Sequence, residues 1–131
     1  MPVIIDQVLE GRPGDDLFLA SESEDGRVAV VFEDDGDTGY FYAWASVNGP
    51  ILDALHVYNV ASIVDRDRPS EYKIGWSLSG RQAILIINGQ AHAVCDFDRE
   101  KGWCRSGFPA SNRKWSLDGH DWDEACIGYF R

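Results

Sequence analysis

The chain has 131 residues, 44% of them hydrophobic and 26% charged, values typical of one folded domain and unlike those of a disordered or fibrous protein. No apolar run approaches the roughly 18 residues that cross a bilayer, and the start of the chain lacks the features of a signal peptide. We therefore expect a cytoplasmic protein. The net charge of −10 disfavours binding to nucleic acid or anionic lipid, which requires clustered Lys and Arg.

The negative charge is concentrated near the start of the chain. Residues 1–53 hold twelve acids and two bases, whereas residues 54–131 hold ten of each. This asymmetry predicts a negative field over one region of the surface, which would attract a basic protein partner. The alternative is that the acids only keep the protein in solution.

Alternation of apolar and polar residues predicts strands in the first part of the chain. These strands cover residues 3–9, 17–20, 28–32 and 40–44. Between the last two lies an acidic run that includes a glycine, so we expect a β-hairpin with an exposed acidic tip. Its acids are Glu33, Asp34, Asp35 and Asp37.

Residues 51–59 are predicted to form the one main helix. A turn at Asn48 precedes this segment, and Pro50 suits the first helical position. Asp53 and His56 would lie on a narrow polar stripe of that helix while apolar neighbours face the core.

The second half of the chain is predicted to form an antiparallel meander. Its strands cover residues 72–78, 83–87, 91–97 and 103–105. Asn88 and Gly89 give a strong hairpin signal because both residues tolerate positive φ. The tail from residue 112 to 131 fits either a short helix or an edge strand. The expected fold is a single α+β domain over residues 1–131, with an antiparallel sheet packed against one helix.

Cys95, Cys104 and Cys126 form neither a chelating pair nor a disulfide framework. We therefore expect reduced, structural thiols, no bound metal and no cofactor. The acidic run also lacks the ligand spacing of an EF-hand calcium loop. No familiar enzyme signature is present, so we expect no catalytic residue. His120 lies among carboxylates and would act in acid–base chemistry only if the tail lined a pocket.

Two neighbouring stretches carry a family resemblance. Residues 32–43 (FEDDGDTGYFYA) and 51–60 (ILDALHVYNV) resemble the signature of a family of small uncharacterised bacterial proteins that is carried as a domain of unknown function. The size and acidity of the chain also resemble those of immunity proteins, which protect a bacterial cell from a toxin by blocking its active site. This second resemblance implies a non-enzymatic inhibitor of a toxin with a basic, nucleotide- or nucleic-acid-binding cleft.

We accordingly expect the partner-binding residues to combine the acidic tip with aromatic and polar side chains. They are Glu33, Asp34, Asp35, Asp37, Tyr40, Asp53, His56 and Trp122. Two alternatives stay open. One is a small enzyme or ligand-binding domain that uses Asp53, His56 and the acidic turn, and the other is a housekeeping protein-interaction module.

Overall fold

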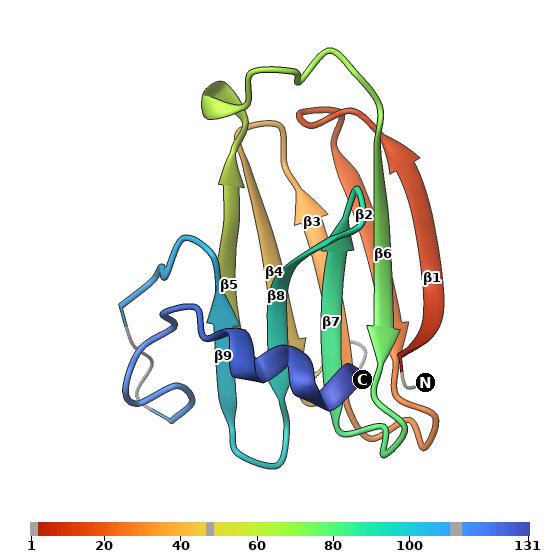
Figure 1. The fold of residues 1–131 in the computed structure, drawn as a ribbon, viewed down its shortest axis with the longest axis vertical. Coiled ribbons are helices and arrows are strands. Elements are labelled where there is room, and N and C mark those ends of the chain that lie inside the picture. The colour runs from red at the N-terminus through yellow and green to blue at the C-terminus, as the bar shows by residue number, and fades with distance from the viewer. Residues whose placement is uncertain (1–2, 47–48, 111–113) are drawn as a thin grey trace.

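The computed structural model describes residues 3–46, 49–110 and 114–131. In these residues nine strands form two antiparallel sheets that face each other (Figure 1). Sheet A has the order β1 (Ile4–Gly11), β6 (Ser70–Trp76), β7 (Gln82–Ile87), β8 (Gln90–Asp96), β9 (Lys101–Cys104). Sheet B has the order β2 (Leu17–Glu22), β3 (Ala29–Asp34), β4 (Thr38–Trp44), β5 (Ile51–Asn59).

Two meanders account for most of the topology. Strands β2 to β5 pair in sequence order within sheet B, and β6 to β9 do the same within sheet A, where β1 adds to the edge beside β6. The predicted hairpin at Asn88 and Gly89 is confirmed: their φ angles are 52° and 81°, and they join β7 to β8. The predicted hairpin between β3 and β4 is confirmed as well.

The main core lies between the two sheets because alternate side chains of each strand point inward. Sheet B contributes Phe32, Phe41 and Leu55, and sheet A contributes Tyr72 and Ile74. All five are fully buried. The rings of Phe32 and Tyr72 stack across the interface with centroids 5.0 Å apart.

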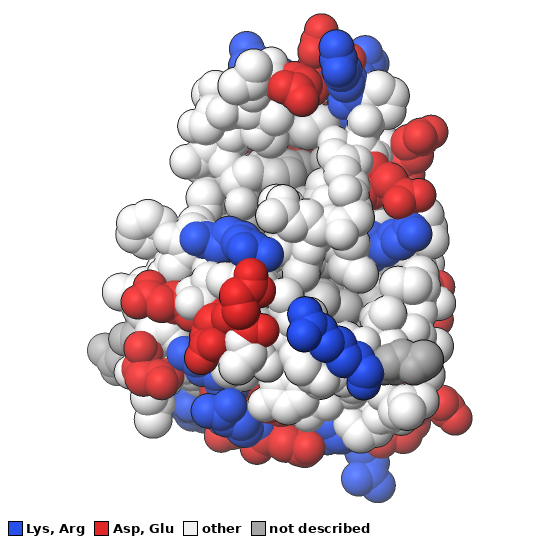
Figure 2. Space-filling view, in the orientation of Figure 1, with Lys and Arg blue, Asp and Glu red and all other residues white. Residues whose placement is uncertain are grey.

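A second, smaller core lies on the outer face of sheet A. The 3₁₀ helix η2 (Glu124–Phe130) crosses that face in front of β7, β8 and β9 (Figure 1). Its buried Cys126 and Phe130 pack in one cluster with Ile84, Val94 and Trp103. On this side of the molecule Lys and Arg are interspersed with Asp and Glu (Figure 2).

The predicted helix over residues 51–59 is wrong, because this segment is the strand β5. Its burial alternates strictly: Asp53, Leu55 and Val57 are buried, whereas the residues between them are partly exposed. Asp53 points into the protein because it pairs there with His120. In the sequence, its polarity suggests a place on the polar stripe of a helix. The fold is therefore mostly β, with two antiparallel sheets in place of one sheet and a main helix.

The remaining elements follow the sequence pattern closely. Every other predicted strand is present, with small shifts at its ends. A second 3₁₀ turn, η1 (Val60–Ser62), follows β5. The ambiguous tail ends in η2, whose first turn is capped by Asp123 through the N–H of Ala125 at 2.9 Å. Asn48 and Asn112 lie outside the described residues.

Candidate partner-binding face

The outer face of sheet B is formed by the side chains that alternate with the core residues of the same strands. We call this surface the sheet B face. The register of the four strands places its central members in cross-strand rows. They are Phe18, Ala20, Glu22, Ala29, Val31, Glu33, Tyr40, Tyr42, Trp44, Ala54 and His56.

One row of this face brings three of the predicted partner-binding residues together. Glu33 on β3 is the register partner of Tyr40 on β4, which in turn pairs with His56 on β5. Phe18 extends the row on one side, and Phe108 on the other, its ring 6.4 Å from that of His56. The two phenylalanines are 60% and 63% exposed, which leaves an apolar surface open to a partner.

Aromatic side chains dominate the centre of the sheet B face. The rings of Tyr40 and Tyr42 stack with centroids 5.8 Å apart, and Trp44 continues the same side of β4. Burial raises the pKa of the Tyr42 hydroxyl, and the nearby Glu33 carboxylate raises it further. Tyr42 therefore presents a neutral hydroxyl at physiological pH. Tyr and Trp are the residues most enriched at binding hot spots.

Charge on the sheet B face has one sign. Strands β2 to β5 contain no Lys and no Arg. At one end of the face Glu33, Asp35 and Asp37 are exposed. At the other end lies Glu22, which pairs with Ala29. The two acidic ends are separated by four residues of β3, about 13 Å at roughly 3.3 Å per residue.

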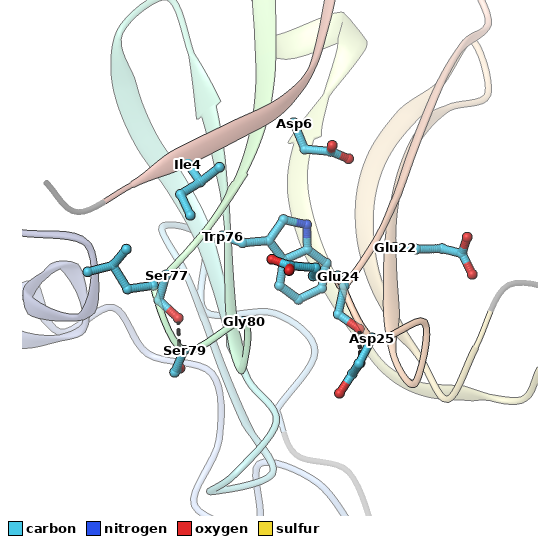
Figure 3. Close-up of a pocket in the computed structure, with 11 residues that line it drawn as sticks. Ile4, Asp6, Glu22, Glu24, Asp25, Trp76, Ser77, Ser79 and Gly80 are labelled. Carbon is cyan, nitrogen blue, oxygen red and sulfur yellow. Dashed lines mark hydrogen bonds between the residues drawn. The ribbon is translucent and has the colours of Figure 1, made fainter.

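The Glu22 end opens into a cleft with a cavity volume of about 540 Å³ (Figure 3). Asp6, Glu22, Glu24 and Asp25 contribute carboxylates to its lining, together with the indole of Trp76. None of the described residues that line it is Lys or Arg, although Arg27 lies 3.9 Å from the Asp25 carboxylate. The Trp76 N–H donates to Ser21 Oγ at 2.8 Å, so the ring is fixed in place. The cleft extends the negative surface of the sheet B face around the edge of β2.

The hairpin tip divides its acids between structure and surface. Asp35 is exposed, and its carboxylate accepts hydrogen bonds from the N–H groups of Thr38 and Asp37 at 2.9 Å and 3.0 Å. These bonds lower the pKa of Asp35. Asp35 and Asp37 are therefore surface charges, as expected.

Asp34 is not a surface residue, which corrects the expectation that all four acids of the tip are exposed. Its side chain is 1% exposed. The carboxylate accepts from the hydroxyl of Tyr58 at 2.6 Å and from the N–H groups of Gly14 and Gly36 at 2.7 Å and 2.8 Å. Both glycines have positive φ, near 95° and 99°, which the turns need to direct their N–H groups inward. Asp34 holds loops together and is closed to a partner.

Asp53 is likewise buried, at 1% exposure, and does not belong to the sheet B face. It meets His120, which the sequence placed in an ambiguous tail: His120 Nε2 lies 2.9 Å and 3.0 Å from the two carboxylate oxygens. Ser116 Oγ donates to Asp53 at 2.6 Å. Asp53 and His56 therefore lie on opposite faces of β5 and share no pocket.

The buried Asp53, His120 and Ser116 have the side chains of a serine-hydrolase triad in a different arrangement. A triad requires the serine hydroxyl to donate to the histidine. Here the hydroxyl donates to the aspartate, and all three residues are at most 1% exposed. The cluster joins β5 to the chain after β9, and its geometry indicates a structural role.

Trp122 lies away from the sheet B face, so the structure does not bring it together with Glu33, Tyr40 and His56. It packs at the margin of the cluster on the outer face of sheet A. The guanidinium of Arg105 lies 4.1 Å from the centre of its ring, a cation–π contact.

The three cysteines are free and buried, as expected. Cys95 and Cys104 face the main core, whereas Cys126 lies in the cluster on the other side of sheet A. Burial raises the pKa of each thiol, that of Cys126 to about 12. Within the described residues no group of three or more His, Cys, Asp or Glu side chains is arranged to hold a metal ion.

Comparison with known proteins gives a family and one relative. A family model described as "Uncharacterized protein conserved in bacteria (DUF2251)" matches residues 11–131. The chain belongs to this family. The match includes all of sheet B and therefore the whole sheet B face. No solved structure matches the chain.

The chain is also similar to a protein of Haemophilus influenzae (strain ATCC 51907 / DSM 11121 / KW20 / Rd) described as an uncharacterized protein. The two are 43% identical over 104 residues, which is 72% of this chain. The aligned region spans 65% of the relative's length. Among the described residues no helix has the length and apolar character needed to cross a membrane.

Proposed function

We propose that this protein is a non-enzymatic inhibitor that binds a basic surface of a partner protein through the sheet B face. The observation that carries the proposal is the combination on that face of exposed aromatic side chains, acids at both ends and strands without a single Lys or Arg. The partner class that fits is a bacterial toxin whose active site is basic because it binds nucleotides or nucleic acid.

The physical basis of the proposal is a division of labour between the centre and the ends of the face. Rigid aromatic rings such as Tyr40 and Tyr42 bury a large apolar area with little loss of side-chain entropy. Exposed carboxylates such as Asp37 at one end and Glu22 at the other steer a cationic partner toward the face and fix its orientation. A partner held there would lose access to its own anionic substrate. No transfer of atoms is needed, so the role requires no cofactor.

The competing hypothesis of an enzyme or ligand-binding domain built on Asp53, His56 and the acidic turn receives less support. Those groups lie on two faces of β5, and Asp53 is already committed to His120. A housekeeping interaction module would use the same face as an inhibitor. The two are separated by whether binding blocks an activity of the partner.

The experiment starts with site-specific photocrosslinking in the native cell. A photoreactive phenylalanine derivative replaces Tyr42 on the sheet B face and, as the matched control, Tyr129 of η2 on the opposite side. The partner crosslinked through residue 42 is identified, purified and assayed with and without this protein. We expect a basic protein whose activity is inhibited, with an association rate that falls as salt rises.

Quantitative support comes from variants of the same face. Tyr40→Ala is expected to weaken binding by about 2 kcal/mol or more, roughly 30-fold in Kd, if this ring is at the centre of the interface. Glu33→Gln should mainly slow association. Crosslinking of the same protein through residues 42 and 129, or a partner that binds with unchanged activity, would contradict the inhibitor proposal.

A further inference from the structure

The protonation state of His120 follows from its surroundings. The ring is fully buried, and its Nδ1 faces the carbonyl oxygen of Pro109 while Nε2 faces the carboxylate of Asp53. A carbonyl oxygen only accepts hydrogen bonds, and so does an ionised carboxylate. A neutral imidazole has one N–H and can satisfy only one of them. Both are satisfied by the imidazolium form.

The hydrogen bonds around Asp53 favour its ionised form. The N–H of Gly102 donates to Ser116 Oγ at 2.8 Å, which leaves the serine hydroxyl free to donate to Asp53 at 2.6 Å. The N–H of Ala54 donates to the other carboxylate oxygen at 3.0 Å. With donors already at both oxygens, the carboxylate has no need of its own proton. These contacts favour the ion pair His120⁺ and Asp53⁻.

This pair is connected to the sheet B face through Phe108 and Pro109. The Phe108 carbonyl accepts from the backbone N–H of His56 at 2.9 Å, and the two rings lie edge to face. Ser106 Oγ donates to the His56 carbonyl at 2.9 Å. The residues 106–109 thus lie against β5, held from the inside by His120 at Pro109 and from the outside at His56.

We propose that the charge of His120 controls the position of Phe108, and through it the binding of a cationic partner to the sheet B face. The binding part of this inference rests on the proposed function, whereas the link between His120 and Phe108 does not. When His120 loses its proton, either Pro109 or Asp53 loses its donor. The weaker acceptor is the neutral carbonyl, so the Pro109 end is released and Phe108 loses its fixed place beside His56.

The direction of the pH response follows from the groups around the ring. Burial lowers the pKa of His120, but the hydrogen bonds with Asp53 and Pro109 outweigh it, and the net pKa is raised. Lys101 opposes the charge from β9. Among the described residues, the titratable or charged groups near the pair are Asp53, Cys95, Lys101, Cys104, Asp118 and Asp121, the last beside Gly107. Because the folded pKa of His120 lies above the ordinary value of 6.5, the contact of Nδ1 with Pro109 holds Phe108 in place below that pH. The contact is lost as pH rises through the folded pKa.

The variant Asp53→Asn separates this mechanism from a general alkaline effect. The amide of an asparagine at position 53 has an N–H that can donate to Nε2 of a neutral His120, while Nδ1–H still donates to Pro109. This variant should keep Phe108 in place both below and above the pH at which His120 of the parent loses its proton. With its nitrogen in place of Oδ2, the asparagine keeps its oxygen for the N–H of Ala54 and gives its second N–H to Ser116 Oγ, so the Ser116 contact is kept with its direction reversed.

The test follows the full-length protein by NMR from about pH 6 to about pH 9, a range centred above the ordinary histidine pKa. We expect both ring nitrogens of His120 to be protonated at the acidic end, and the Phe108 and His56 amide signals to shift with the His120 midpoint. In Asp53→Asn, those amide shifts should disappear. A neutral His120 at pH 6, or a Phe108 that ignores the His120 midpoint, would overturn the proposed link.

Binding is read in the same samples with a synthetic peptide of alternating arginine and glycine, whose charge is constant over this range. We expect its apparent Kd to rise about threefold between the two ends of the titration in the parent, an effect typical of one contact at an interface rim, and to stay constant in Asp53→Asn. A peptide that contacts the sheet B face equally at both ends would refute control by His120. A peptide that contacts other surfaces only would count against the proposed function, while the amide shifts would still decide the link to Phe108.

Discussion

The two sheets of this domain treat their outer faces differently. Sheet A carries aliphatic residues such as Ile84 and Val94 on its outer side, and the chain returns at its end to cover them with η2. Sheet B carries Tyr40, Tyr42 and Trp44 on its outer side, partly exposed, and neither described helix packs on them. Aliphatic side chains gain only from leaving water, so they require a cover. Tyrosine combines an apolar ring with a hydroxyl group, so Tyr40 and Tyr42 tolerate water and remain available to a partner.

The distribution of charge follows the same division. The outer side of sheet A has both signs, interspersed (Figure 2), as on an ordinary solvated surface. The strands of sheet B contain Asp and Glu but no Lys or Arg. An unmixed charge next to exposed aromatic rings contributes little to folding, and this supports the proposal that the sheet B face binds a partner.

The largest expected effect is on the free energy of unfolding, and it distinguishes acids on the inner face of sheet B from acids on its outer face. Asp53→Ala leaves the imidazolium of His120 buried without its counter-charge and should lower the free energy of unfolding by about 4 kcal/mol. Glu33→Ala removes an acid from the outer side of the same sheet and should change it by less than about 0.5 kcal/mol. Urea unfolding at pH 6 measures both. Equal losses would show that the two acids have the same structural role.

The cover of sheet A should come next in size. Phe130 is 6% exposed and packs in the same cluster as Trp103, so Phe130→Ala should lower the free energy of unfolding by about 3 kcal/mol through lost burial and a cavity. The resulting variant should also expose apolar surface and bind a hydrophobic dye. If Phe130→Ala has the same free energy of unfolding as the parent, η2 does not stabilise sheet A. The two outer faces would then not differ in their need for a cover.

A smaller effect concerns pH. Because the folded pKa of His120 is raised, its contribution to stability is complete below about pH 6.5 and is lost as pH rises through the folded value. Burial and Arg105 lower the pKa of His92, so that residue contributes the opposite slope. We expect stability to fall from pH 6 toward pH 8 most clearly in His92→Gln, and urea unfolding across that range measures it. A rise in stability in that variant would mean that His120 is neutral in the folded state.

The sequence predicted every strand except β5, and both hairpins, because a period of two identifies strands and the residues that share a face. Glu33, Tyr40 and His56 were expected to bind a partner, but their row on one sheet was not predicted, because His56 was placed on a helix. Prediction failed where polarity and burial disagree. Asp34 and Asp53 are acids whose partners, Tyr58 and His120, are 24 and 67 residues away, and no local pattern shows such a pairing. With Asp53 treated as exposed, the pattern of residues 51–59 predicts a helix, whereas these residues form strand β5. The alternation of Tyr40, Tyr42 and Trp44 was the available signal for the sheet B face.

The smallest expected effect on folding is on the sheet B face itself. Phe18 is 60% exposed and Ile51 is 56% exposed, so Phe18→Ser should change the free energy of unfolding by less than about 0.5 kcal/mol. The same substitution should weaken binding of the partner identified by crosslinking, because the contact area of the Phe18 ring beside Glu33 is lost. Urea unfolding and calorimetric titration of the partner provide the two numbers. A variant that binds normally but unfolds easily would reverse the assignment, since Phe18 would then be part of the fold and its exposure no sign of a partner.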